Sequence, residues 1–434
     1  MKDKMNSLFS TPSQRAFLAL IALLFLWPKF IVIAPSVSPY TIMVLICISL
    51  SAAFLIFGRK TDSRLTYLST VAAVFFGIFF TVRFYADIVS RTVASSIYYD
   101  LRDLIWGGSL FFIALMSARR SDIRDRIGKI VCWSAVAIMI AALVEQITRL
   151  SLPALIMQYL PITIDDQFRQ MLVQDKSREE AFRSQAFFSH PIVLGQVSAS
   201  SFPIVLSIFL SGRIRLLCMV AMASCVIAIY FSGSRSGFIA LIAGVLCSIF
   251  LFVSLSRSKL ALAAAVVALP FAILAVPIIA GTVETLAVGR SAVEQRSSDM
   301  RALMWQNGDA AIQSSPINGH GAGNSAALAG IRARFGGTFT IDDYYLSLIL
   351  DAGYLALAIF SVFILLVFLI TFTAGGPTYL RFFRAGLFSA VVSILVSFKA
   401  TSILEGMAFL YLYTGLIISS SLRRDSVNEE LQND

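Results

Sequence analysis

The amino-acid sequence predicts an all-α polytopic membrane protein. Of its 434 residues, 58% are hydrophobic and 14% are charged, whereas soluble domains carry about 25% charged residues. Apolar runs of about 18 residues or more recur along the chain, and each is long enough to cross roughly 30 Å of hydrocarbon. Short loops rich in Lys and Arg separate many of these runs, which is typical of the charge bias that orients membrane spans.

About twelve transmembrane helices are predicted. They correspond to residues 16–34, 40–57, 66–84, 101–117, 129–147, 191–211, 214–231, 236–254, 260–280, 343–371, 382–398 and 403–420. Placing the N-terminus in the cytoplasm puts most short basic loops on that side, so both termini are expected to be cytoplasmic. The two long loops, 148–190 and 281–342, then lie on the outer side.

This topology divides the chain into three predicted parts. Residues 1–190 form an N-terminal transmembrane scaffold, with spans one to five and the loop 148–190. Residues 191–422 form a core that contains the large loop 281–342 between spans nine and ten, and residues 423–434 form a cytoplasmic tail.

Composition excludes several classes of partner. The net charge of +10 follows from topogenic loops, so no nucleic acid is expected. The five cysteines all lie in apolar segments, and there are only two histidines. The cysteines are therefore interpreted as small core residues, and neither a metal site nor any other cofactor is expected.

Several arginines are predicted on the outer side or at the outer membrane edge. Arginine keeps its charge and binds phosphate in a fork geometry, so such a cluster suits a lipid-linked phosphate or diphosphate. Contacts with lipid head groups or ion pairs within the loop are the alternative. The residues are Arg183, Arg235, Arg290, Arg296 and Arg301.

Arg235 follows Ser232-Gly233-Ser234 with almost no loop between two spans. Small residues allow a tight turn, and the arginine then opens the next helix, where backbone N–H groups also favour an anion. The alternative is an arginine that extends to the membrane interface.

The glycine-rich segment from Asn318 to Asn324 lacks a preceding strand and a Walker lysine, so it does not indicate nucleotide binding. We interpret it as a tight turn near a substrate. His320 within it is a candidate proton carrier or polar contact, with a structural role as the alternative. His190 precedes Pro191 at a helix entry and is interpreted as a packing or capping residue.

Asp342 and Asp343 begin the tenth span. Acidic residues at a helix N-terminus stabilise the helix dipole. Either carboxylate is also a candidate general base for a sugar hydroxyl. Asp351 lies farther along the same apolar segment, where ionisable groups tend to be functional.

Taken in order, these motifs resemble the O-antigen ligase and polysaccharide polymerase superfamily (Wzy/WaaL-like) of bacterial envelopes. The resemblance rests on Ser-Arg-Ser-Gly at the start of a span, Arg301-x-x-x-Trp305, the segment 316–324, and Asp351-Ala352-Gly353-Tyr354. It covers roughly residues 180–370. It implies a GT-C-like glycosyltransferase of the bacterial inner membrane that acts on the periplasmic side, without metal or nucleotide sugar.

The resemblance implies a sugar chain on undecaprenyl diphosphate as donor, with Arg235 and Arg301 holding the diphosphate. Arg183, Arg290 and Trp305 are further candidate substrate contacts. Ligases of this group carry a histidine where this chain has Asp342 and Asp343. The departure favours an exopolysaccharide or O-antigen repeat-unit polymerase over a ligase that transfers glycan to lipid A-core or protein.

A lipid-linked sugar transporter or flippase is the alternative from another class. A transporter would have charges along a path through the membrane and repeat symmetry, whereas the polar residues here concentrate in an outer loop. Membrane lipids surround such an enzyme, and a chain-length regulator and a flippase of the same pathway are its candidate protein partners.

Overall fold

The computed structural model describes residues 2–27, 31, 38–57, 67–90, 92–117, 121–152, 155–156, 182–212, 214–255, 292–332 and 339–421. In these ranges the regular elements are helices apart from one short hairpin, in which Ile331–Arg332 (β1) pairs with Phe339–Thr340 (β2). Seven of the described helices are long and apolar enough to cross a membrane. The predicted class, an all-α polytopic membrane protein, is confirmed.

The predicted spans coincide with helices wherever the chain is described, and the predicted span 260–280 lies outside the described residues. The earlier spans include α1 (Lys2–Leu26), α2 (Pro39–Phe57) and α6 (Ser121–Thr148). The later spans are α9 (Pro191–Leu210), α10 (Arg215–Ser232), α11 (Arg235–Leu255), α15 (Tyr344–Thr373), α16 (Thr378–Ser397) and α17 (Leu404–Ser420).

The predicted span 101–117 begins earlier in the structure. Helix α4 (Val93–Asp103) runs through a π-helical turn, η1 (Leu104–Gly108), into α5 (Ser109–Ser117). The early turns are polar, yet Asp100 and Asp103 are buried and form ion pairs with Arg83 of α3 (Tyr67–Val89). Pairing offsets the cost of burying these charges, which is why hydropathy alone misplaced the start of the helix.

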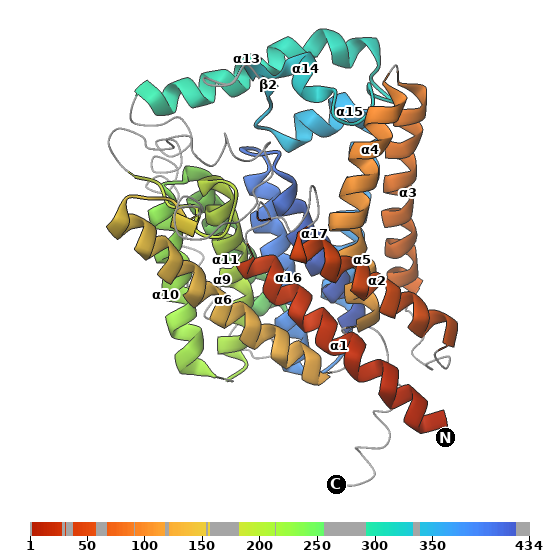
Figure 1. The fold of residues 1–434 in the computed structure, drawn as a ribbon, viewed down its shortest axis with the longest axis vertical. Coiled ribbons are helices and arrows are strands. Elements are labelled where there is room, and N and C mark those ends of the chain that lie inside the picture. The colour runs from red at the N-terminus through yellow and green to blue at the C-terminus, as the bar shows by residue number, and fades with distance from the viewer. Residues whose placement is uncertain are drawn as a thin grey trace.

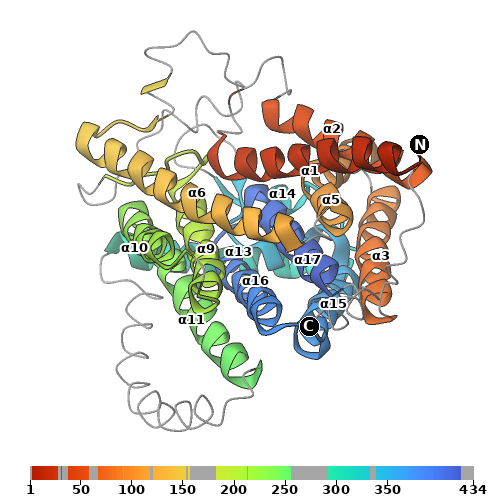
Figure 2. The same cartoon turned by 90° about the horizontal axis from the view of Figure 1, so that it is seen from below.

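Helix α17 lies in the middle of the bundle. Phe409, Leu410 and Tyr411 are fully buried, and Figure 2 shows α17 and α16 surrounded by the other helices. The rings of Phe25 and Phe409 pack edge to face with centroids 4.8 Å apart, an arrangement that aromatic pairs favour.

Two helices cover one end of the bundle. They are α13 (Ala292–Ser314) and α14 (Ser325–Ala329), drawn in teal across the top of Figure 1. An apolar cluster that includes Met304, Ile312, Leu346 and Leu350 holds α13 against the first turns of α15. This contact brings α13 to the end of the bundle where α11 and α15 begin.

Candidate functional site

Arg235 is the first residue of α11. The turn before it is tight because Gly233 adopts a left-handed conformation with φ +56°, which glycine tolerates best. Ser234 Oγ accepts a hydrogen bond from the backbone N–H of Gly237 at 3.3 Å, as an N-cap residue does. The predicted placement of Arg235 at a helix start is therefore confirmed.

Arg183 is held against the same turn. Its Nε donates to the carbonyl oxygen of Ser232 at 2.9 Å, and its side chain is 7% exposed. Glu145 of α6 fixes the following segment, since its Oε2 accepts from the backbone N–H groups of Gln185 (2.7 Å) and Ala186 (2.8 Å). A buried carboxylate thus positions the chain that carries Arg183.

Arg301 and Trp305 lie one turn apart on α13 and so share a face of that helix. Arg301 is half-buried, and its Nε has no hydrogen-bond partner. Burial is the largest cause that lowers the pKa of Arg301, and repulsion from Arg235 lowers it further, against attraction from Asp342 and Asp343. These influences place Arg235, Arg301 and the two aspartates in one electrostatic neighbourhood.

Asp343 is completely buried and caps α15. Its Oδ1 accepts from the backbone N–H groups of Tyr345 (3.0 Å) and Leu346 (3.2 Å). Its Oδ2 accepts from Trp305 Nε1 at 2.8 Å and from Lys399 Nζ at 2.6 Å. This carboxylate therefore joins α13, the start of α15 and the turn between α16 and α17.

Lys399 is a site residue that the sequence analysis did not identify. Its side chain is 60% exposed, and its ammonium lies 4.5 Å from the centroid of the Trp305 ring, within the range of a cation–π contact. The available signal was a lone basic residue between the last two apolar segments. Nothing in the sequence indicates that Lys399 lies beside Asp343, which is 56 positions earlier.

Asp342 is exposed, in contrast to its neighbour. Its backbone N–H points to Met304 Sδ at 3.5 Å, and Ser402 Oγ donates to the carbonyl oxygen of Ile341. The segment is thus fixed from two sides while the carboxylate remains accessible next to Arg301.

His320 lies in the turn between α13 and α14, near the C-terminal end of α13. Its Nε2 donates to the carbonyl oxygen of Ala311 at 2.8 Å. Ten residues of helix, about 15 Å, separate Ala311 from Arg301. The structure therefore does not bring His320 to the arginines, and its catalytic role stays a prediction. His190, by contrast, accepts from the backbone N–H of Ile192 and caps α9, as predicted.

The glycine-rich turn docks onto protein groups. The backbone N–H groups of His320, Gly321 and Ala322 donate to Leu350 O, Asp351 O and Asp87 Oδ1, each at 2.8 Å. Asp351 Oδ1 accepts from the backbone N–H of Ser325 at 2.8 Å. The tight turn is confirmed, and these N–H groups already have acceptors.

Two predicted residues are not placed. Arg290 lies outside the described residues, and for Arg296 only the helical backbone is described. Across the described ranges, no group of three or more His, Cys, Asp or Glu side chains is arranged to hold a metal ion.

A family model described as O-antigen ligase matches residues 218–361. This segment is similar to the O-antigen ligase family, in agreement with the resemblance seen in the sequence. No curated protein matches the sequence. The matched segment contains Arg235, Arg301, Trp305, Asp342 and Asp343.

Two further basic residues of the candidate site lie outside the matched segment. Arg183 precedes the matched segment and Lys399 follows it. The four basic side chains come from the segment before α9, from α11, from α13 and from the α16–α17 turn. They outnumber Glu145, Asp342 and Asp343 by one, so an anionic ligand would complement the charge of the site.

Proposed function

We propose that this protein is a glycosyltransferase that polymerises undecaprenyl-diphosphate-linked oligosaccharide repeat units on the periplasmic side of the bacterial inner membrane. The product is an exopolysaccharide or an O-antigen. The observation that carries the proposal is that Arg235 and Arg301 lie in one electrostatic neighbourhood with Asp342 and Asp343. Arg183 is held against the turn before Arg235, and Lys399 is paired with Asp343.

The arginines suit the diphosphate of the donor. Arg235 combines its charge with the N-terminus of α11, where N–H groups favour an anion. Arg301 has an unpartnered Nε in a half-buried setting, so a phosphate oxygen would supply its missing acceptor. Fixed cations also stabilise the charge that develops on a leaving diphosphate.

The two aspartates take different roles in this proposal. Both oxygens of Asp343 already accept hydrogen bonds, and Lys399 offsets its charge. Asp342 is accessible and is the candidate base. It takes the proton of the acceptor hydroxyl while that oxygen bonds to the anomeric carbon. The carbon–oxygen bond to diphosphate breaks, and the lipid diphosphate leaves with the electron pair.

The same site chemistry also serves a ligase, which differs in its acceptor. A carboxylate in place of the ligase histidine supports the polymerase, with the growing glycan moved onto the next lipid-linked repeat unit. The acceptor must therefore be tested directly. A chain-length regulator and a flippase of the same pathway remain candidate partners.

The experiment uses the purified full chain with lipid-linked repeat units as the only substrate, and gel electrophoresis of the products. The wild type should give a ladder of polymers, and Arg301→Ala should abolish it. Arg126→Ala is the matched control, because Arg126 is exposed at the start of α6 and should keep the ladder.

Unextended substrate in every lane would contradict self-sufficient polymerisation. Transfer only after a lipid A-core acceptor is added would instead identify a ligase. Appearance of the lipid-linked sugar on the other side of a vesicle, without new bonds, would identify a transporter.

A further inference from the structure

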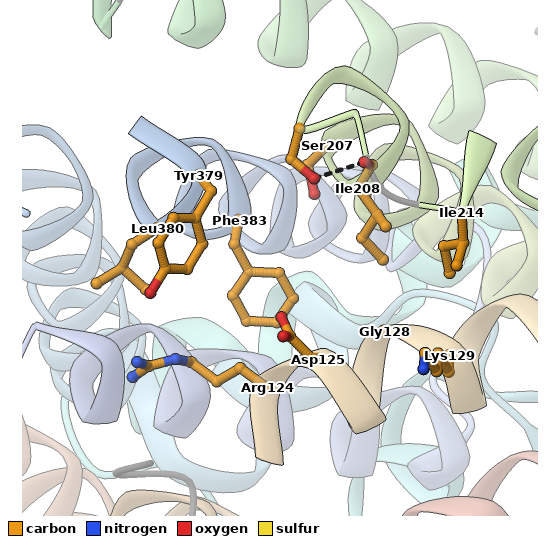
Figure 3. Close-up of a pocket in the computed structure, with 11 residues that line it drawn as sticks. Arg124, Asp125, Gly128, Lys129, Ser207, Ile208, Ile214, Tyr379, Leu380 and Phe383 are labelled. Atoms are coloured by element: carbon orange, nitrogen blue, oxygen red, sulfur yellow. Dashed lines mark hydrogen bonds between the residues drawn. The ribbon is translucent and has the colours of Figure 1, made fainter. Parts of the chain in front are cut away.

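A cavity of about 350 Å³ opens at the end of α16 opposite to Lys399. Helix α16 has 20 residues from Thr378 to Ser397, so about 30 Å of helix separates the two ends. Side chains from α6, from the end of α9 and from the start of α16 surround the cavity (Figure 3). Its size is that of a small-ligand site, and it is distinct from the arginine cluster.

The cavity has a charged rim and an apolar wall. Arg124, Asp125 and Lys129 of α6 supply charge, and Tyr379 adds a hydroxyl group. The apolar wall is formed mainly by Ile208, Leu380 and Phe383. A site of this composition fits an amphiphile whose polar end is anionic.

A buried cation next to the cavity strengthens the case for an anion. Arg384 is fully buried and donates to the carbonyl oxygens of Ser420 (3.2 Å), Gly375 (2.7 Å) and Ala374. Its Nε has no partner, and within the described part of the chain no carboxylate binds it. Arg124, which lines the cavity, repels it electrostatically, as does Arg381.

Among the described residues, this end of the bundle carries more positive than negative charge. Arg124 and Lys129 line the cavity together with Asp125, and the buried Arg384 lies within electrostatic range of Arg124 and Arg381. A buried charge that lacks a counter-ion is costly, so an anion held in the cavity would lower the free energy of the folded state. Basic pockets between transmembrane helices are suited to lipid head groups.

We propose that this cavity binds the phosphate head group of an anionic membrane lipid. Arg124 and Lys129 contact the phosphate, and the first acyl carbons lie against Leu380 and Phe383. The site is independent of the glycosyltransferase reaction proposed for the other end of α16. It gives this end of the bundle a specific lipid.

The alternative explanation for these basic residues, a general charge bias that orients the spans, predicts a different pattern of lipid binding. If the basic residues serve only to orient the spans, Arg126 should attract lipid as well as Arg124 does. Arg126 lies two residues further along α6, is exposed and does not line the cavity. It is therefore the matched control.

Native mass spectrometry of the purified full chain in detergent tests the proposal, with phosphatidylglycerol and phosphatidylcholine added in separate experiments. The wild type and Arg126→Gln should retain the anionic lipid preferentially. The double variant Arg124→Gln/Lys129→Gln should lose that preference by about tenfold, the effect of one charge-assisted contact. An excess of soluble glycerol phosphate should not displace the lipid, because it has no acyl chain.

Equal retention of phosphatidylglycerol by the double variant and by Arg126→Gln would overturn the proposal, since binding would then be non-specific. Displacement of the lipid by glycerol phosphate would overturn it as well and would identify a site for free phosphate. Both readouts are independent of polymerase activity, so failure of one proposal leaves the other intact.

Discussion

At the scale of single residues, Asp342 and Asp343 are adjacent but differ in environment. Asp342 is exposed beside Arg301, whereas Asp343 is buried and hydrogen-bonded on both oxygens. The sequence alone did not show which of the two aspartates is the base, because both lie at the start of the same predicted span. The turn before α15 directs the side chain of Asp342 outward and that of Asp343 inward, which is the ground for proposing Asp342 as the base.

Asp342→Asn should lower kcat by about 10²-fold to 10⁴-fold, the usual contribution of a general base, with the melting temperature unchanged. The reason is that the amide keeps the shape of the side chain and loses the basic oxygen. Steady-state kinetics with lipid-linked repeat units and a thermal melt measure both quantities. Full activity in Asp342→Asn would exclude it as the base.

Asp343→Ala should instead destabilise the fold. The substitution removes the N-cap of α15, which contributes about 1 kcal/mol. It also leaves the buried indole N–H of Trp305 without an acceptor, which costs about 1–3 kcal/mol. Chemical denaturation of the purified protein measures the loss, with Asp309→Ala on the outer, exposed face of α13 as control. An unchanged unfolding free energy would contradict the role of Asp343 as an anchor.

Lys399→Met should raise KM for the lipid-linked donor by about tenfold, as expected for loss of one charge-assisted contact. Stability should also fall, because the completely buried carboxylate of Asp343 loses the cation that offsets its charge. Lys399→Arg should restore most of the affinity, since it keeps the charge. A lower melting temperature with an unchanged KM would show that Lys399 is structural only.

At the scale of elements, the glycine-rich turn and α15 fit together through their backbones. Gly353 bends α15 with φ +77°, and a Cβ there would lie 1.9 Å from the carbonyl oxygen of Ile317. The backbone N–H of Tyr354 donates to Pro316 O at 2.8 Å. The turn thereby connects the end of α13 to the middle of α15.

Gly353→Ala should therefore destabilise the protein by at least about 2 kcal/mol, because both the left-handed conformation and the close backbone contact reject a side chain. Gly375→Ala is the control, since it follows the same helix and nothing lies within 4 Å of its added Cβ. Expression level and melting temperature in detergent compare the two. Equal stability would mean that the turn is not clamped at Gly353.

Local signals made the element boundaries near the site predictable. Ser234 before Arg235 and Asp343 before Tyr344 are polar residues at the edges of long apolar runs, and both cap helices in the structure. The contact between Lys399 and Asp343 was not predictable, because it depends on how the α16–α17 turn packs beside α13. Long-range packing of this kind leaves no periodic pattern in a single sequence.

At the scale of the whole molecule, the two ends of the bundle have different chemistry. Arg235, Arg301 and Asp342 gather at the end that α13 covers (Figure 1). The cavity lined by Arg124 and Lys129 lies at the other end of α16. Excess basic residues on short loops favour the cytoplasmic side, so the cavity end is predicted to be cytoplasmic and the arginine cluster periplasmic.

Cysteine labelling measures this orientation directly. Ile317, 63% exposed after α13, and Arg126, exposed on α6, are replaced by cysteine in separate variants. Four native cysteines are buried and the fifth is half-buried, so the wild type should react slowly with a membrane-impermeant maleimide. Added outside spheroplasts, the reagent should label Ile317→Cys and spare Arg126→Cys, and inside-out vesicles should reverse the pattern.

The reverse pattern in spheroplasts would place the arginine cluster in the cytoplasm. A periplasmic polymerase needs its donor diphosphate and its acceptor hydroxyl on the outer face, so that result would exclude the proposed function while leaving the geometry of the site unchanged. Labelling of both variants from one side would mean that α16 does not cross the bilayer. The apolar side chains among its 20 residues would then need another environment to bury them.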